Sequence, residues 1–126
     1  MTSPWIAALF FEYLQHYERL TGDRRALALV SDYADFLLAH CLYDGGVNHP
    51  TLTGLRLPCY LCGTDGHYER ETPSEGDGEH AVDVMGVFAY AVAAKRTLGL
   101  PGQPALDAYS SFTQVTSDHI DSRFTF

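Results

Sequence analysis

An acidic cluster with one histidine stands where a polar stretch of the chain meets an apolar one. Glu79, His80 and Asp83 lie close together in the sequence, and Asp77 precedes them. Carboxylates gathered at the start of a helix can divide acid and base roles or bind a hard cation. On a helix, Glu79 and Asp83 share a face and His80 pairs with Asp83. If this segment is catalytic, we expect Asp83 and His80 to be the acid and base, Glu79 their catalytic partner, and Asp77 a further partner that binds substrate.

Asp83 is the strongest catalytic candidate of this cluster because the residues around it in the sequence are apolar. Twelve of the fourteen residues from 81 to 94 are apolar. A carboxylate in such a helix costs free energy unless it is paired, and buried acids are candidate catalytic groups. We therefore expect Asp83 to be substantially buried and hydrogen-bonded near the polar loop. The alternative is that it bonds to backbone or to a tyrosine in the first turns of the helix, and that the neighbouring acids are solvated.

Aromatic residues suggest a sugar-binding surface, because flat rings stack on the apolar side of pyranose rings. The candidates are Trp5, Tyr60, Tyr68 and Tyr90. Of these, Tyr60 and Tyr68 are the expected substrate contacts. The alternative is that these rings belong to the core, as aromatic residues at helical spacing more often do.

Cys59, Cys62 and His67 have the spacing of a metal clip, since two thiolates and an imidazole are natural zinc ligands. The adjoining sequence supplies no fourth ligand, and the alternative is that both cysteines are small, half-buried residues of a β-hairpin. We expect no bound metal. We also expect no structural disulfide, because three cysteines without a secretion signal favour free thiols or a metal. No Walker loop or Gly-x-Gly-x-x-Gly pattern occurs, so no nucleotide cofactor is expected.

The charge and the apolar runs limit the class of partner. Sixteen acidic residues against eight basic ones give a formal charge of −8, which repels phosphate backbones, so no nucleic acid partner is expected. The apolar runs near 5–14 and 81–94 are too short or interrupted for a bilayer, which needs about 20 residues, so we expect a soluble chain with no membrane partner. The sequence does not assign a compartment.

The elements that must position these residues are helical. Apolar residues at three- and four-residue steps predict helices at about 4–20 and 24–42. Gly22 suits the left-handed residue that ends the first helix, and Asp23 suits the cap of the second, so the two helices should form an antiparallel hairpin. The face of the first helix expected to point to the core comprises Ile6, Leu9, Phe10, Tyr13, Leu14, Tyr17 and Leu20.

A long polar loop and a second hairpin are expected to follow. The loop 44–80 contains Asp65-Gly66, a hairpin turn signal, between the stretches 55–62 and 67–72. A third helix is predicted to begin near 77–80, and a weaker fourth helix to place Leu106, Tyr109, Phe112, Val115 and His119 on one face. The predicted fold class is mainly α, with two antiparallel helical hairpins in a single domain over residues 1–126.

The third helix is predicted to lack a solvent face because it is apolar all round. The other three helices offer it thin cover, and leaving large apolar side chains in water forgoes about 1.5–3 kcal/mol each. We therefore expect a homo-oligomer.

One set of residues in the first two helices forms a recognisable pattern: Ser3-Pro4-Trp5-Ile6-Ala7-Ala8-Leu9, Tyr17, Thr21-Gly22-Asp23 and Ala34-Asp35-Phe36-Leu37-Leu38. With this pattern, residues 3–42 resemble one hairpin of the α/α-toroid enzymes, the six-hairpin glycosidase-like superfamily, and residues 78–100 resemble it more loosely. The resemblance implies a toroid-like arc or bundle and a carbohydrate ligand, since relatives include glycoside hydrolases and polysaccharide lyases. A full toroid has more hairpins than the two predicted here, so the chain would be a fragment of a larger toroid or complete its fold by association. The alternative class is a non-enzymatic helical module that self-associates and whose loop is a scaffold or metal clip.

Overall fold

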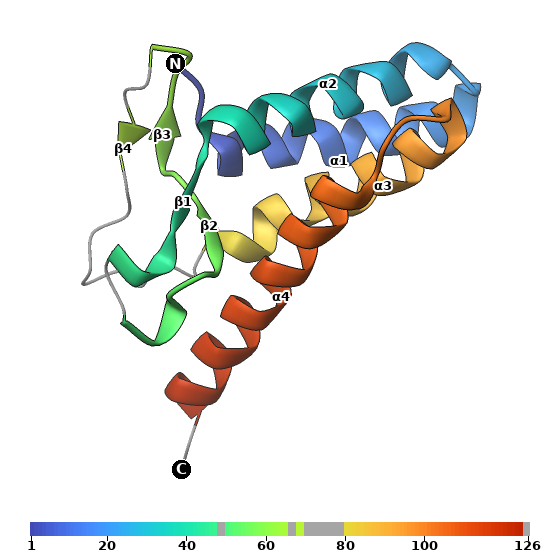
Figure 1. Cartoon of the computed structure of the whole chain (residues 1–126). Helices are drawn as coiled ribbons and strands as arrows, with labels where there is room; N and C mark the ends of the chain where they lie inside the picture. The colour runs from blue at the N-terminus through green and yellow to red at the C-terminus, as the bar shows by residue number, and fades with distance from the viewer. Residues whose placement is uncertain (48–49, 66–67, 70–79, 125–126) are drawn as a thin grey trace.

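The structure, a computed structural model, describes residues 1–47, 50–65, 68–69 and 80–124, and at 68–69 and 118–124 it describes the backbone alone. The described part is mainly helical, with two small antiparallel sheets between the helical hairpins (Figure 1). In chain order its elements are α1 (Pro4–Thr21), α2 (Arg24–His40), β1 (Leu42–Asp44), the 3-10 turns η1 (Gly45–Val47) and η2 (Pro50–Leu52), β2 (Arg56–Pro58), β3 (Leu61–Cys62), β4 (Tyr68–Glu69), α3 (Ala81–Leu98) and α4 (Gln103–Phe124).

The first helical hairpin forms at the predicted turn. Gly22 has a φ of 68°, and its N–H donates to the carbonyl of Glu18 over 2.7 Å, which closes α1. The carboxylate of Asp23 then accepts the backbone N–H of Arg25 at 3.0 Å and caps α2. Local cap chemistry therefore ends one helix and starts the next, and the predicted hairpin is confirmed.

The second hairpin packs beside the first with its turn at the same end of the bundle (Figure 1). Gly99 has a φ of 72° and ends α3 in the same left-handed conformation as Gly22. Across the hairpins, Nη2 of Arg24 donates to the carbonyl of Thr97 over 3.4 Å. Both tight turns thus lie at the end of the helices remote from the strands, so the polar loop and the helix starts of α1 and α3 share the other end (Figure 1).

Helix α3 is the centre of the bundle and packs against α1, α2 and α4. Phe88 of α3 meets Phe112 of α4 edge to face, with ring centroids 5.5 Å apart, and both side chains are fully buried. The open side of α3 is a narrow strip of mostly small residues, namely Val82, Asp83, Gly86, Ala89 and Ala93. The prediction that this helix has no solvent face is therefore wrong, because three neighbouring helices leave one side uncovered.

The fourth helix, Gln103–Phe124, extends beyond both ends of the predicted inward stripe. Of the residues predicted to face inward, Phe112 and Val115 are buried and Tyr109 is half-buried, whereas Leu106 is exposed. The side chain of His119 lies outside the described residues. Ala105 and Ala108 are buried instead, because small side chains let α4 approach α3 closely.

Helix α1 turns the opposite face to the core from the one predicted, whereas α2 buries Leu27, Val30, Ala34 and Leu37. In α1 the buried side chains are Pro4, Ala8 and Phe11. The predicted core stripe is mostly exposed, and only Leu14 of that stripe packs against the core. We call the exposed remainder the outer face of α1; its members and exposed fractions are Ile6 (53%), Leu9 (57%), Phe10 (54%), Tyr13 (74%), Tyr17 (47%) and Leu20 (87%).

Two short antiparallel strand pairs organise the loop. Strands β1 and β2 pair with Tyr43 opposite Leu57, a pairing the sequence did not predict. Strands β3 and β4 pair with Leu61 opposite Glu69, so the predicted hairpin is present as two residues on each side. The backbone of Thr2 bonds to Cys62 in both directions, at 2.7 and 2.9 Å, which ties the N-terminal segment to β3.

A disulfide joins Cys41 to Cys62, whose Cα atoms are 5.4 Å apart and whose side chains are fully buried. The expectation of no structural disulfide is therefore wrong. Pairing of β1 with β2 folds the chain back beside the end of α2, and this brings the two cysteines together. Cys59 is buried and lies outside the disulfide. With Cys62 oxidised, the Cys59 and Cys62 pair cannot supply two thiolates to a zinc ion, and His67 lies outside the described residues.

No helix of the described part has the length and apolar character needed to cross a membrane.

Candidate functional site

Three rings from distant parts of the chain meet at the strand end of the bundle. Trp5 stacks on His80 with ring centroids 4.6 Å apart and planes 8° from parallel. Tyr60 approaches both, with its centroid 6.1 Å from that of Trp5 and 6.2 Å from that of His80. Trp5 lies in the first turn of α1, His80 immediately precedes α3, and Tyr60 lies between β2 and β3. We call Trp5, Tyr60 and His80 the aromatic cluster.

His80 connects the aromatic cluster to a carboxylate. Its Nδ1 lies 3.2 Å from Oδ2 of Asp83, as the predicted spacing of three residues requires. The side chain of Asp83 is 50% exposed and that of His80 is 24% exposed. The expectation that Asp83 is substantially buried is therefore wrong, because Asp83 lies on the open side of α3. An exposed carboxylate beside an imidazole is accessible to a ligand.

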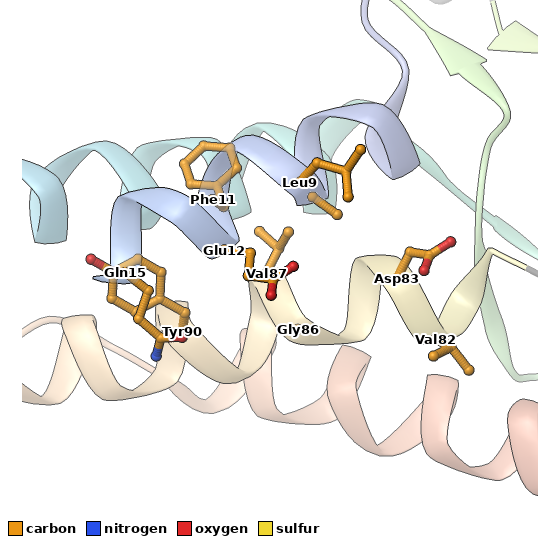
Figure 2. Close-up of a pocket in the computed structure, with 10 residues that line it drawn as sticks. Leu9, Phe11, Glu12, Gln15, Val82, Asp83, Gly86, Val87 and Tyr90 are labelled. Atoms are coloured by element: carbon orange, nitrogen blue, oxygen red, sulfur yellow. The ribbon is translucent and has the colours of Figure 1, made fainter. Parts of the chain in front are cut away.

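A groove of about 270 Å³ runs between α1 and α3, and Asp83 is part of its wall (Figure 2). We call it the α1–α3 groove. Its apolar lining comprises Ala8, Leu9, Phe11, Val82 and Val87, and its polar lining comprises Glu12, Gln15, Asp83 and Tyr90, with Gly86 between them. Figure 2 shows Asp83 toward one end of the groove, with Gln15 and Tyr90 together at the other. A Cβ placed on Gly86 would have no heavy atom within 4 Å, so the groove is open at its middle.

Tyr90 brings a buried hydroxyl to the groove. Its side chain is 4% exposed, and in the described part of the chain its hydroxyl has no hydrogen-bond partner. Burial raises the pKa of this phenol, and the negative charge of Glu18 adds to the shift. A buried polar atom without a partner costs free energy, so a ligand hydroxyl or a water that bonded to it would be stabilised.

The structure brings some of the predicted site residues together and leaves others apart. Asp83, His80 and Tyr60 meet at one place, together with Trp5. The backbone of Tyr68 pairs with Cys62, and its side chain lies outside the described residues. Glu79 and Asp77 also lie outside the described residues.

Glu12 and Gln15 are groove residues that the sequence did not reveal. Both come from α1, and the expected orientation of that helix placed its apolar stripe, not these two side chains, against the bundle. No sequence motif includes these two residues, so only the packing of α1 on α3 shows that they line the same groove as Asp83.

The arrangement combines a stack of rings, an accessible acid with an adjacent imidazole, and a groove with a second carboxylate, an amide and a phenol. Among the residues that the structure describes, no group of three or more histidine, cysteine or acidic side chains could hold a metal ion. Comparison with protein-family models, curated proteins and solved structures gave no match to this chain.

Proposed function

We propose that this chain is part of a carbohydrate-active protein of the α/α-toroid type, and that the α1–α3 groove and the aromatic cluster together bind a neutral oligosaccharide. The observation that carries the proposal is the position of Asp83. Its carboxylate lines the groove and also lies 3.2 Å from His80 of the aromatic cluster. The same carboxylate therefore lies between the aromatic cluster and a groove whose walls are mostly apolar with several polar groups.

The lining of the groove suits a sugar. Gln15, Glu12 and Tyr90 offer an amide, a carboxylate and a hydroxyl, which can exchange hydrogen bonds with sugar hydroxyls. Leu9 and Val82 offer apolar surface for the carbon faces of a ring. Ligand pockets usually combine apolar walls with a few polar groups that fix orientation.

The aromatic cluster extends this lining at the strand end of the bundle. Tyr60 is 38% exposed, so part of its ring is open to a ligand. Trp5 and His80 cover one face of each other and so support a fixed position for the cluster. The formal charge of −8 disfavours an anionic polysaccharide, which is why we propose a neutral one.

In a reaction, Asp83 would act as the general acid or base, with His80 as its proton partner. Both glycoside hydrolysis and elimination from a polysaccharide use groups of this kind at the scissile bond. The family resemblance supports these two reaction classes equally.

The single tryptophan makes the proposal testable, because emission from Trp5 reports on the aromatic cluster directly. Titration with a panel of neutral oligosaccharides should shift this emission for at least one of them. The Gly86→Leu variant, which projects a side chain into the middle of the groove, should weaken that binding at least tenfold, whereas Gly86→Ala should bind nearly as well as the unchanged chain. If no oligosaccharide shifts the emission or produces heat on mixing, the carbohydrate proposal is wrong.

A second candidate function is a self-associating helical module, and the outer face of α1 favours it. Six large apolar side chains on one helix are about half or more exposed. A continuous apolar patch of this kind usually marks an interaction surface. Sedimentation equilibrium at micromolar concentration separates this candidate from a monomeric sugar-binding protein.

A further inference from the structure

Four residues of the outer face of α1, together with the exposed His16, have the spacing of a coiled-coil seam. Ile6, Leu9, Tyr13, His16 and Leu20 follow one another at steps of three, four, three and four residues. All five side chains are exposed. A stripe with an average step of 3.5 residues stays on one side of a helix and packs against a second helix with the same repeat.

Two different edges flank this seam. Glu12 and Arg19, seven residues apart, follow one edge, and both are exposed. Phe10 and Tyr17, also seven residues apart, follow the other. One edge therefore carries an acid and a base one heptad apart, and the other edge carries two rings at the same interval.

We propose that the chain forms a twofold dimer in which the outer faces of two α1 helices pack antiparallel to each other. Reversing the helix direction places Glu12 of each copy opposite Arg19 of the second copy, which forms two equivalent ion pairs on one edge. The same operation places Phe10 opposite Tyr17 of the second copy on the other edge. Charge and ring complementarity thus arise from a single register.

The core of the seam agrees with that register. In it, Leu9 of one copy packs against Leu20 of the second copy, and Tyr13 packs beside His16 of the second copy. Each layer occurs twice because the interface is isologous. Tyr13 and Leu20, at 74% and 87%, have the largest exposed fractions of the outer face, so both the middle and the outer layers of the proposed contact contain a side chain with much surface to bury.

A parallel pairing fits these residues less well. Parallel helices would place Glu12 beside Tyr17 of the second copy and would form no pair between Glu12 and Arg19. The two charges would then lie at the edge of an apolar interface without opposite partners.

The exposed area is suitable for a stable dimer. Aromatic side chains bury roughly 150–250 Å² each, so the exposed parts of Phe10, Tyr13 and Tyr17 alone amount to on the order of 400 Å² per copy. The aliphatic residues of the outer face add to this and bring it toward the roughly 800 Å² per partner of a standard interface. Because α1 is already held by α2 and α3, ordering the helix adds little cost to association.

This inference does not depend on carbohydrate binding; it deepens the self-association candidate by naming the surface, the orientation and the contacts. Leu9 and Glu12 stand at the boundary between the outer face and the α1–α3 groove. In the proposed dimer the carboxylate of Glu12 pairs with Arg19 of the second copy, so Asp83 is the carboxylate that still lines the groove.

A charge swap tests the ion pairs. Sedimentation equilibrium of the full chain should report a dimer, and Glu12→Arg or Arg19→Glu should each raise the dimer dissociation constant about tenfold, since each variant replaces two attractions by two repulsions. The chain with both substitutions should return to the unchanged dissociation constant. Asp32→Arg is the matched control, because it makes the same change of charge at an exposed position of α2 and should leave the dimer intact.

Cross-linking tests the orientation. An equimolar mixture of Leu9→Cys and Leu20→Cys chains should form a disulfide-linked dimer under mild oxidation, whereas either variant alone should not. A chain that stays monomeric overturns both the dimer and the self-association candidate. If the charge swap leaves the dimer dissociation constant unchanged, or if the Leu9→Cys chain alone cross-links equally well, the antiparallel α1 interface is wrong. Self-association through another surface would still be supported.

Discussion

Lys95 of α3 extends to Asp35 of α2, and its Nζ lies 2.8 Å from Oδ2 of that carboxylate. The side chain of Lys95 is 4% exposed, whereas that of Asp35 is 59% exposed. The aliphatic part of the lysine side chain is thus packed between helices, while its ammonium group donates a hydrogen bond to a carboxylate at the surface. This ion pair joins the two helical hairpins across α2 and α3.

Removing the carboxylate should cost more than removing the lysine charge. Asp35→Ala leaves a buried ammonium group without its counterion and should lower the free energy of unfolding by about 1–3 kcal/mol. Lys95→Met keeps the packed stem without the charge, and its free energy of unfolding should stay within about 1 kcal/mol of the unchanged chain. Urea denaturation of both variants measures the difference. Equal losses would mean that the ammonium group left without its counterion adds no penalty beyond the loss of the ion pair.

The disulfide should be visible as a thiol count. Denatured protein without reductant should present one reactive thiol per chain, from Cys59, and three after reduction. Reduction should lower the free energy of unfolding by about 3 kcal/mol, the value expected for a loop of this length. Cys59→Ala is the control and should leave the effect of reductant unchanged. Three reactive thiols before reduction would contradict the disulfide.

Zinc should be present in less than stoichiometric amount in protein purified without chelator. Elemental analysis measures the zinc content. One equivalent of zinc that is lost in the Cys59→Ser variant would contradict this prediction, since it would require a reduced Cys62 and therefore an open disulfide.

Asp83 should matter to binding and not to stability. The side chain of Asp83 is half exposed and that of its partner His80 is partly exposed, and a solvent-accessible pair of this kind contributes little to stability. Asp83→Ala should therefore change the free energy of unfolding by no more than about 0.5 kcal/mol while weakening any oligosaccharide binding or turnover. Thermal denaturation and the Trp5 titration provide the two readings. A large loss of stability with unchanged binding would remove Asp83 from the site.

Asp23 should make part of the stability depend on pH. Hydrogen bonds from the side chain and the backbone of Arg25 hold the pKa of this carboxyl well below its usual range. A carboxyl with a lower pKa in the folded state stabilises the fold above its unfolded pKa of about 3.9 and loses that contribution as the pH falls through the folded value.

The Asp23→Asn variant isolates that charge, because asparagine can still cap α2. Its deficit in free energy of unfolding should be largest at neutral pH and should shrink progressively below about pH 4. Urea denaturation at several pH values measures this, with Asp32→Asn as the control at an exposed position of the same helix. A deficit that is the same at every pH would show that capping, and not charge, is what the variant loses.

Helix boundaries could be predicted because their causes are local. Pro4 begins α1, Gly22 ends it and Asp23 caps α2, and each effect depends on the residue and its immediate neighbours. The spacing between His80 and Asp83 was predictable for the same reason. The pair forms even though His80 precedes the helix proper.

The orientation of α1 could not be predicted because an exposed apolar stripe and a buried apolar stripe have the same period. The apolar residues around Tyr13 form the more regular pattern, yet Ala8 and Phe11 on the opposite side are the ones that pack inward. Periodicity locates an apolar face of a helix and does not identify what that face contacts.

Contacts between distant segments could not be predicted from the sequence either. Trp5 meets His80 only because α1 and α3 begin at the same end of the bundle (Figure 1). Cys41 meets Cys62 only because a short strand pair folds the loop back, and an odd number of cysteines gave no sign of which two would pair.

The disulfide also determines whether the protein stays covalently joined after a protease cleaves the loop between Cys41 and Cys62. Between Cys41 and Cys62 the chain passes through Thr51, Thr53 and Gly54, which are exposed at the tip of the loop, and such tips are preferred sites of cleavage. A cut at this tip would leave two polypeptides held by the sulfur bridge and by the packed helices. The nicked protein would travel as one species on a non-reducing gel and separate only with reductant, so it could persist as a covalent two-chain molecule.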